Sequence, residues 1–170
     1  MSMLAYEEWQ SPIGMITIVA DNEKLYSFQY GSFKQNETEL IQWCKKYQLP
    51  TSFIHQSPVI DEAIKQLTEY FNGERKQFSV DYVLHGTSFQ KKVWHALSEI
   101  PYGKTCSYQD IARKIGTEKA VRAVGGANNK NPISIIIPCH RVIGKNGKMV
   151  GYGGGLDKKE YLLKLEELKG

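Results

Sequence analysis

The stretch SYQDIARKIGTEKAVRAVGGANNKNP, residues 107 to 132, contains the pattern that decides the fold of the second half of the chain. Ser107 with Asp110 predicts a capping box at the start of a helix, and Gly116 is expected to end that helix. Thr117 is placed to cap a second helix. Two short helices joined by a glycine-containing turn form the helix-turn-helix pattern.

The second of these helices has an unusual composition on one side. Val121 and Val124 point in one direction. Another face carries cationic and very small residues, namely Lys119, Arg122, Ala123 and Gly126. Because glycine costs a helix roughly 1 kcal/mol relative to alanine, exposed helix positions seldom carry it. We therefore expect another molecule to approach this face closely.

Farther along, an apolar run ends on three reactive side chains. The stretch IIIPCHRVIG, residues 135 to 144, reads as a strand that leads into Cys139, His140 and Arg141. A thiol is a weak nucleophile until it ionises, and nearby cations or a base lower its pKa. In a continuing strand His140 would point away from Cys139, so their pairing requires a turn, which Pro138 favours, or a bridging water.

Simpler interpretations of Cys139 stay open at this point. Cys139 can be an inert buried thiol, with His140 a core residue. A zinc site is disfavoured, because no other cysteine or histidine shows paired ligand spacing around Cys139.

The loop GYGGGL, residues 151 to 156, departs from the dinucleotide-binding pattern at Leu156, so we do not expect it to bind a dinucleotide. Cys44 and Cys106 lack neighbouring bases of this kind, and we expect both to be structural.

The overall composition is that of an ordinary globular protein. Of 170 residues, 41% are hydrophobic and 24% charged, which disfavours disordered, collagen-like and membrane classes. The three cysteines form no CxxC pair, so reduced thiols are expected. Glu7 and Glu8 stand where a signal peptide would carry its apolar core, so we expect an intracellular protein. The net charge of +4 permits a nucleic-acid partner without requiring one.

The first half of the chain shows strand and helix patterns in turn. Residues 3 to 31 alternate apolar and polar positions around turn signals, which predicts an antiparallel meander. Residues 59 to 73 place apolar side chains at helical spacing, which predicts an amphipathic helix. Thr87 with Gln90 predicts another capping box, and a domain boundary is expected just before it. The fold class is therefore α+β: a small N-terminal antiparallel-sheet domain with a helix, and a mainly helical C-terminal domain containing the helix-turn-helix.

Three stretches together carry a family resemblance. They are AVRAVGGANNKNP from residue 120, NPISIIIPCHRVIG from residue 131 and GYGGGLDKKEYLLKLE from residue 151. From about Ser88 to Glu166 the chain strongly resembles the O6-alkylguanine-DNA alkyltransferase family, whose members repair alkylated guanine in DNA and act once. Before Ser88 the resemblance is one of architecture. It implies a ribonuclease H-like α/β domain at 1–85 and a DNA-binding alkyltransferase domain at 86–170.

The resemblance implies roles for five catalytic residues. Cys139 is the alkyl acceptor, and His140 is the base that deprotonates it through a water. Glu166 holds and polarises His140, as the third member of a triad does. Tyr108 rotates the target phosphate and donates toward the guanine ring, and Asn131 fixes the turn and joins the hydrogen bonds of the site. Without the resemblance, Glu166 reads as a solvated helix acid.

The resemblance also implies a helix that binds DNA in the minor groove, although the motif alone would favour the major groove. Arg122 enters the base stack in place of the extruded nucleotide. The small residues Ala123, Gly126 and Ala127 allow the close approach.

The resemblance also implies a base pocket, and two positions, Gly153 and Asn129, depart from the family pattern. Tyr152 lines the pocket by stacking. Gly153 stands where the family often carries serine, so only its backbone amide can contact the base oxygen. Asn129 stands at a position that is often cationic in the family, between the second helix and Asn131, which is expected to weaken a phosphate contact.

The function implied is direct-reversal DNA repair by a methylated-DNA-protein-cysteine S-methyltransferase. Cys139 attacks the alkyl carbon on O6 of an extruded guanine, with O4-methylthymine as a second candidate substrate. The stable thioether product makes the reaction irreversible and single-turnover. No cofactor and no metal are expected, because the N-terminal region offers only Cys44, His55 and His85 as zinc ligands.

The expected partner is double-stranded DNA bearing O6-alkylguanine, bound by a monomer without membrane association. The expected location is the cytoplasm, or the nucleus in a eukaryote. Two alternatives are a non-catalytic protein that binds alkylated lesions and a Cys-His acyl-transfer hydrolase. The presence of Cys139 argues against the first, and the second leaves the Arg122 helix unexplained.

Overall fold

A computed structural model describes residues 3–55, 57–147 and 151–169 of the chain. The chain divides into two compact units, Met1–His85 and Gly86–Gly170. The first unit contains, in order, β1 (Leu4–Ser11), β2 (Gly14–Ala20), β3 (Leu25–Tyr30), α1 (Phe33–Lys46), β4 (Phe53–His55) and α2 (Pro58–Phe71).

The sheet of the first unit has the strand order β3-β2-β1-β4. β1 pairs with β2 and β2 with β3 in antiparallel register, which confirms the predicted meander. β4 runs parallel to β1, so the complete sheet is mixed. The α+β class is confirmed. The parallel edge strand β4 was not predicted, because a run of three residues is too short to show a strand pattern.

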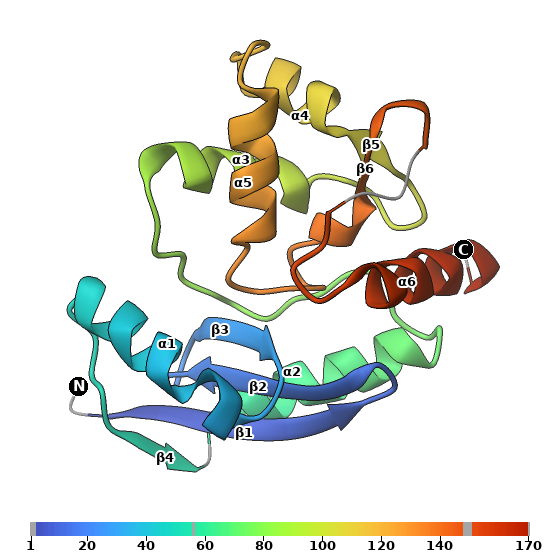
Figure 1. The fold of residues 1–170 in the computed structure, drawn as a ribbon. Coiled ribbons are helices and arrows are strands. Elements are labelled where there is room, and N and C mark those ends of the chain that lie inside the picture. The colour runs from blue at the N-terminus through green and yellow to red at the C-terminus, as the bar shows by residue number, and fades with distance from the viewer. Residues whose placement is uncertain (1–2, 56, 148–150, 170) are drawn as a thin grey trace. The chain divides into compact units, whose positions relative to one another are not determined.

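Two helices cover opposite faces of this sheet (Figure 1). Tyr6 of β1 stacks on Phe33 of α1, with ring centroids 3.9 Å apart. Trp9 of β1 lies against Phe71 of α2 at 6.0 Å. Because odd and even positions of a strand point to opposite faces, α1 and α2 pack on different sides. Helix α2 was predicted from its apolar spacing; α1 was missed, although its Ser32 capping box was readable in the sequence.

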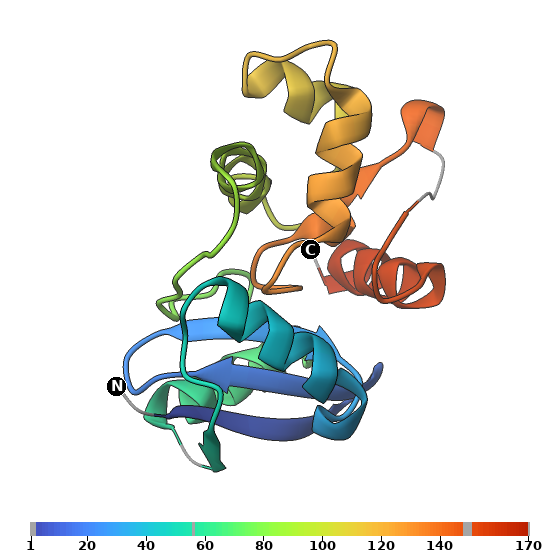
Figure 2. The same ribbon diagram turned by 60° about the vertical axis from the view of Figure 1, so that its left-hand side comes forward.

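The second unit is mainly helical. Its elements are α3 (Ser88–Ser98), β5 (Cys106–Ser107), α4 (Tyr108–Lys114), α5 (Val121–Asn129), the 3-10 turn η1 (Cys139–Arg141), β6 (Val142–Ile143), η2 (Lys145–Gly147) and α6 (Leu156–Lys169). The capping boxes predicted at Thr87 and Ser107 are both present. Figures 1 and 2 show α4 across the N-terminal end of α5, as the helix-turn-helix pattern predicts.

The start of α5 corrects the sequence prediction. Thr117 does not cap this helix, because α5 begins at Val121 and its N-cap, Ala120, makes no side-chain cap. The backbone N–H of Ala120 instead donates to the carbonyl of Thr117 at 2.9 Å, which closes a turn between the helices. Lys119 therefore lies in that turn and not on the face of α5.

The run from Ile133 to Ile137 also differs from its prediction, because it is a compact loop and not a strand. An isolated bridge links Ser134 to Ile137. Ile135 has a φ of 70°, a left-handed conformation that β-branched residues rarely adopt. The following turn, η1, bends the chain at Cys139, as pairing of Cys139 with His140 requires.

No helix within the described ranges is long and apolar enough to cross a membrane.

Candidate active site

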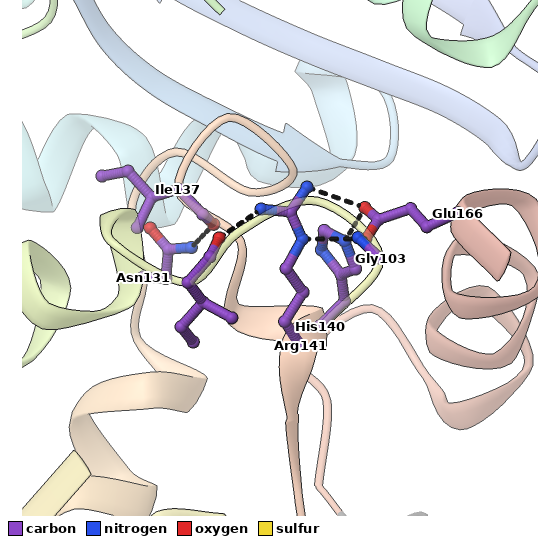
Figure 3. Close-up of polar contacts among 7 residues, drawn as sticks. Gly103, Asn131, Ile137, His140, Arg141 and Glu166 are labelled. Carbon is purple, nitrogen blue, oxygen red and sulfur yellow. Dashed lines mark hydrogen bonds and ion pairs between the residues drawn. The ribbon is translucent and has the colours of Figure 1, made fainter. Parts of the chain in front are cut away.

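Asn131 holds the turn that presents Cys139. Its Nδ2 donates to the carbonyl of Ile137 at 2.7 Å, and its Oδ1 accepts the backbone N–H of Ile133 at 3.0 Å (Figure 3). The N–H of Cys139 donates to the same Ile137 carbonyl at 2.8 Å. Asn131 is itself buried, so both ends of its amide are used to fix the loop before the thiol.

His140 and Arg141 both reach Glu166 on α6 (Figure 3). Nε2 of His140 lies 2.6 Å from Oε2 of Glu166. Arg141 donates through Nε to Oε1 at 2.8 Å and through Nη2 to Oε2 at 3.0 Å, and its Nη1 donates to the carbonyl of Ile100. Glu166 is only 1% exposed, so it is not the solvated helix acid that its surrounding sequence suggests. Its neighbour Glu167 is exposed.

Glu166 stays ionised in this arrangement. Burial alone raises the pKa of its carboxyl group, but the hydrogen bonds and charges of His140 and Arg141 outweigh burial and hold that pKa well below its usual range. Since an arginine is always charged, Arg141 keeps Glu166 anionic whether or not His140 carries a second proton.

His140 has the character of a neutral base. Burial lowers the pKa of its imidazole, and the hydrogen bond to Glu166 offsets this only in part. Because an ionised carboxylate accepts the Nε2–H, the proton-accepting lone pair of neutral His140 lies on Nδ1. Nδ1 is buried and has no hydrogen-bond partner in the part of the chain that the structure describes.

The pKa of the Cys139 thiol is not lowered, although its neighbours His140 and Arg141 led us to expect this. Burial raises the pKa of its thiol to about 11, although the side chain of Asn131 and the charge of Lys159 act in the opposite direction. Arg141 does not lower this pKa as a neighbouring cation was expected to do, because its guanidinium is directed to Glu166. The resting thiol is therefore protonated near neutral pH, and a nucleophilic role requires a base.

Lys159 is a site residue that the sequence did not reveal. Its side chain is fully buried, and Nζ donates to the carbonyls of Val142 at 2.5 Å and Gly151 at 3.0 Å. Burial lowers the pKa of this ammonium to about 8. A signal was present, because Lys159 shares one face of α6 with Leu162 and Glu166 at helical spacing.

Tyr108 lies at the start of α4, half-buried, beside the same site. Burial raises the pKa of its hydroxyl, as does the charge of Cys139, and a hydrogen bond from the side chain of Asn128 partly offsets the rise. Asn128 also donates to the carbonyl of Cys139, at 3.4 Å. No sequence pattern marked Asn128, which lies three residues before Asn131.

The exposed face of α5 contains most, but not all, of the predicted DNA-contact residues. Arg122, Ala123 and Gly126 are exposed. Ala127 is only 4% exposed, and its carbonyl accepts a hydrogen bond from Nε1 of Trp94 at 2.8 Å. Ala127 therefore belongs to the core side of α5, which corrects its predicted place on the contact face.

The loop before α6 carries the two predicted pocket residues. Tyr152 is half-buried and Gly153 is exposed. A Cβ added to Gly153 would lie 3.3 Å from the carbonyl of Asn129, so this loop packs close to the end of α5. Within the described ranges, no three histidine, cysteine or acidic side chains are grouped to hold a metal ion.

Comparisons with known proteins agree on one family. Residues 88–168 match the model described as 6-O-methylguanine DNA methyltransferase, DNA binding domain, and residues 4–82 match its ribonuclease-like domain. A protein of Methanosarcina acetivorans named methylated-DNA--protein-cysteine methyltransferase is 51% identical over 95% of this chain and 97% of its own. A protein of the same name from Mycobacterium tuberculosis is 45% identical over 97% of this chain and 93% of its own.

Solved structures give the same result. The Mycobacterium tuberculosis OGT in complex with DNA has a TM-score of 0.82 and 40% identity, covering 98% of this chain and 94% of that one. The O6-methylguanine-DNA methyltransferase of Pyrococcus kodakaraensis has a TM-score of 0.68 and 26% identity, covering 96% and 99%. With both family models matched in order along nearly the whole chain, this protein belongs to the 6-O-methylguanine DNA methyltransferase family.

Proposed function

We propose that this protein repairs O6-alkylguanine in DNA by transferring the alkyl group once, and irreversibly, to its own Cys139. The observation that carries the proposal is the burial of the Cys139 thiol and the His140 imidazole on one turn, with the Glu166 carboxylate of α6 in contact with that imidazole. Relatives named methylated-DNA--protein-cysteine methyltransferase support the same reaction.

The residues of the site allow a balanced reaction. His140 accepts the proton of Cys139 on Nδ1, through a bridging water, and the anionic Glu166 stabilises the imidazolium that forms. The sulfur then attacks the alkyl carbon, an S–C bond forms and the C–O6 bond breaks. The electron pair leaves with guanine, which takes a proton with Tyr108 as the donor. Because a thioether has no activated carbonyl for water to attack, each molecule acts once.

The DNA side of the proposal rests on α5 and the glycine-rich loop. Arg122, Ala123 and Gly126 form an exposed face that can lie in the minor groove, with Arg122 filling the gap left by the extruded nucleotide. Tyr152 stacks on the extruded base, and the amide of Gly153 contacts its oxygen. Residues 86–170 then act as the DNA-binding alkyltransferase domain and 1–85 as the ribonuclease H-like domain of a cytoplasmic monomer without a cofactor.

Label transfer tests this function. The protein is incubated with duplex DNA that carries O6-methylguanine labelled in its methyl group, and the labelled peptide is identified by mass spectrometry. Label is expected on the peptide containing Cys139, and Cys139→Ser should abolish transfer while lesion binding persists. Cys106→Ser is the matched control and should transfer normally. Label that still reaches the protein in Cys139→Ser would reject the assignment of the nucleophile.

A further inference from the structure

Asn128 of α5 hydrogen-bonds two residues of the proposed site, Cys139 at its backbone carbonyl and Tyr108 at its hydroxyl. It is 1% exposed. Its Nδ2 donates to the carbonyl of Cys139 at 3.4 Å, and its side chain also hydrogen-bonds the hydroxyl of Tyr108. A carboxamide NH₂ group has two hydrogens, so it can serve two acceptors at once. One side chain therefore links the loop of the nucleophile to the tyrosine.

The other end of the Asn128 amide is not used for folding. Its Oδ1 is buried and makes no hydrogen bond with any residue that the structure describes. A buried acceptor without a partner costs stability, and an apolar side chain of the same size would avoid that cost. The presence of asparagine here is better explained by what its NH₂ group does than by packing.

Two glycines lie close to Tyr108, and neither offers it a side-chain contact. A Cβ added to Gly125 would lie 3.9 Å from the ring of Tyr108, so α5 already lies close to that ring. A Cβ added to Gly151 would lie 3.1 Å from the hydroxyl, and Gly151 has a φ of 61° that favours glycine. These two glycines make room for the tyrosine without side-chain polar groups. The carboxamide of Asn128 provides a directional contact that they lack.

We propose that Asn128 is a positioning residue for alkyl transfer, holding the Tyr108 hydroxyl and the Cys139 carbonyl in one fixed frame. The proposal rests on the function proposed above, in which Tyr108 donates a proton as guanine leaves. Asn128 makes and breaks no covalent bond. It aligns proton donation at the leaving group with attack by the sulfur, and it fastens both to the helix that carries Arg122.

Two reactions at the same sulfur separate positioning from a general structural effect. Benzyl transfer from free O6-benzylguanine releases guanine, which needs a proton, whereas alkylation of Cys139 by iodoacetamide releases iodide, which needs none. Asn128→Leu keeps the branched shape of the side chain and removes both hydrogen bonds. It should slow benzyl transfer at least about 10-fold more than it slows reaction with iodoacetamide, within the range of general acid catalysis. Equal slowing of both reactions would overturn the proposal.

A double-mutant cycle with Tyr108→Phe gives the second readout. If Asn128 acts through Tyr108, Asn128→Leu should have little further effect on benzyl transfer once the hydroxyl is absent. Undiminished slowing in the Tyr108→Phe background would overturn the inference. Val124→Ala, a buried change in the same helix, is the control: it should lower the melting temperature and leave the ratio of the two rates unchanged.

The cycle also distinguishes the inference from the function beneath it. Failure of the wild-type protein to transfer label from O6-methylguanine in duplex DNA to Cys139 would remove the proposed function and this inference with it. Normal benzyl transfer by Tyr108→Phe would remove the role of Tyr108, and therefore of Asn128, while the alkyl transfer itself stands. A slow Tyr108→Phe variant without coupling to Asn128→Leu would reject only the inference.

Discussion

At the scale of single residues, the site combines a thiol that burial keeps protonated with a base that burial keeps neutral. Burial raises the pKa of Cys139 to about 11 and lowers that of His140. A buried and protonated thiol lacks the nucleophilicity of an exposed thiolate. In the proposed reaction, transfer near neutral pH therefore depends on a proton passing from the Cys139 thiol to His140, whose imidazole contacts Glu166.

His140→Asn should expose this dependence. We expect alkyl transfer at pH 7 to fall by about 10² to 10⁴, the usual contribution of a general base. Because the pKa of Cys139 is raised to about 11, the variant should recover as pH rises and the thiol ionises without help. Stopped-flow measurement of benzyl transfer from pH 7 to pH 10 tests this, with the exposed His95→Asn as control. A pH-independent loss would contradict the base role.

Glu166→Gln removes the ion pair with Arg141, and the loss of stability relative to wild type should depend on pH. Breaking a buried pair typically costs 3–5 kcal/mol, because Arg141 is left without a counter-charge. The pKa of Glu166 is lower in the folded protein than its ordinary value of 4.5. The stabilisation is therefore complete above pH 4.5 and is lost as pH falls through the folded value.

Urea unfolding at pH 7, 5, 4 and 3 measures this difference between wild type and Glu166→Gln. The gap in unfolding free energy should shrink below pH 4.5. Glu167→Gln, at the exposed neighbouring position, should show little gap at any pH. A gap for Glu166→Gln that stays constant to pH 3 would mean that the carboxylate charge does not stabilise the fold.

At the scale of elements, α5 has a buried side that builds the site and an exposed side for the proposed DNA contact. Arg122→Ala should slow repair in duplex DNA at least about 10-fold more than reaction with free O6-benzylguanine, because a free base needs no extrusion and unstacking costs a few kcal/mol. Lys119→Ala removes the same charge from the turn outside the helix and is the control. Equal losses on both substrates for Arg122→Ala would place Arg122 in the chemistry or the fold.

Gly126 allows a test in which stability and DNA binding move in opposite directions. A Cβ added there would meet nothing within 4 Å, so a larger residue fits the isolated protein. Gly126→Leu should stabilise the helix by up to about 1 kcal/mol, because leucine is the better helix former. It should nevertheless weaken duplex binding about 10-fold or more, because the larger side chain prevents close approach of the minor groove. Thermal unfolding and fluorescence anisotropy measure the two effects. Unchanged duplex affinity would exclude this face from the contact.

At the scale of the whole molecule, the side chains of the proposed site all belong to residues 86–170, while 1–85 form a separate compact unit. Leu67 of α2 is fully buried in the first unit. Leu67→Ala should cost about 2–5 kcal/mol of stability and leave benzyl transfer from the free base unchanged in native buffer. Denaturant unfolding and rate measurements on the same sample test both parts. A slower reaction in the folded variant would show that the first unit supports the chemistry.

The sequence by itself determined the features that depend on neighbouring residues. The capping boxes at Thr87 and Ser107, the apolar face of α2 and the meander follow from interactions within a few positions of the chain, and all are present. The family, too, could be read from the run that includes Pro138 and Cys139, and it is confirmed. Thr117 failed as a cap because the turn before α5 closes through backbone atoms, and side-chain propensities do not predict that choice.

Only the tertiary structure decided how the site residues meet and how they ionise. Glu166 is 26 positions from His140, and although helical spacing separates it from the exposed Glu167, nothing local shows that it meets an imidazole. Asn128 looks like an ordinary surface residue in sequence, and the helical spacing of Lys159 does not show what it lies near, but packing buries both beside Cys139. The direction in which a pKa moves depends on the balance of desolvation against charges and hydrogen bonds brought from distant positions. Those positions become neighbours only when the helices pack, which is why the chain shows which groups are present and the fold sets their protonation.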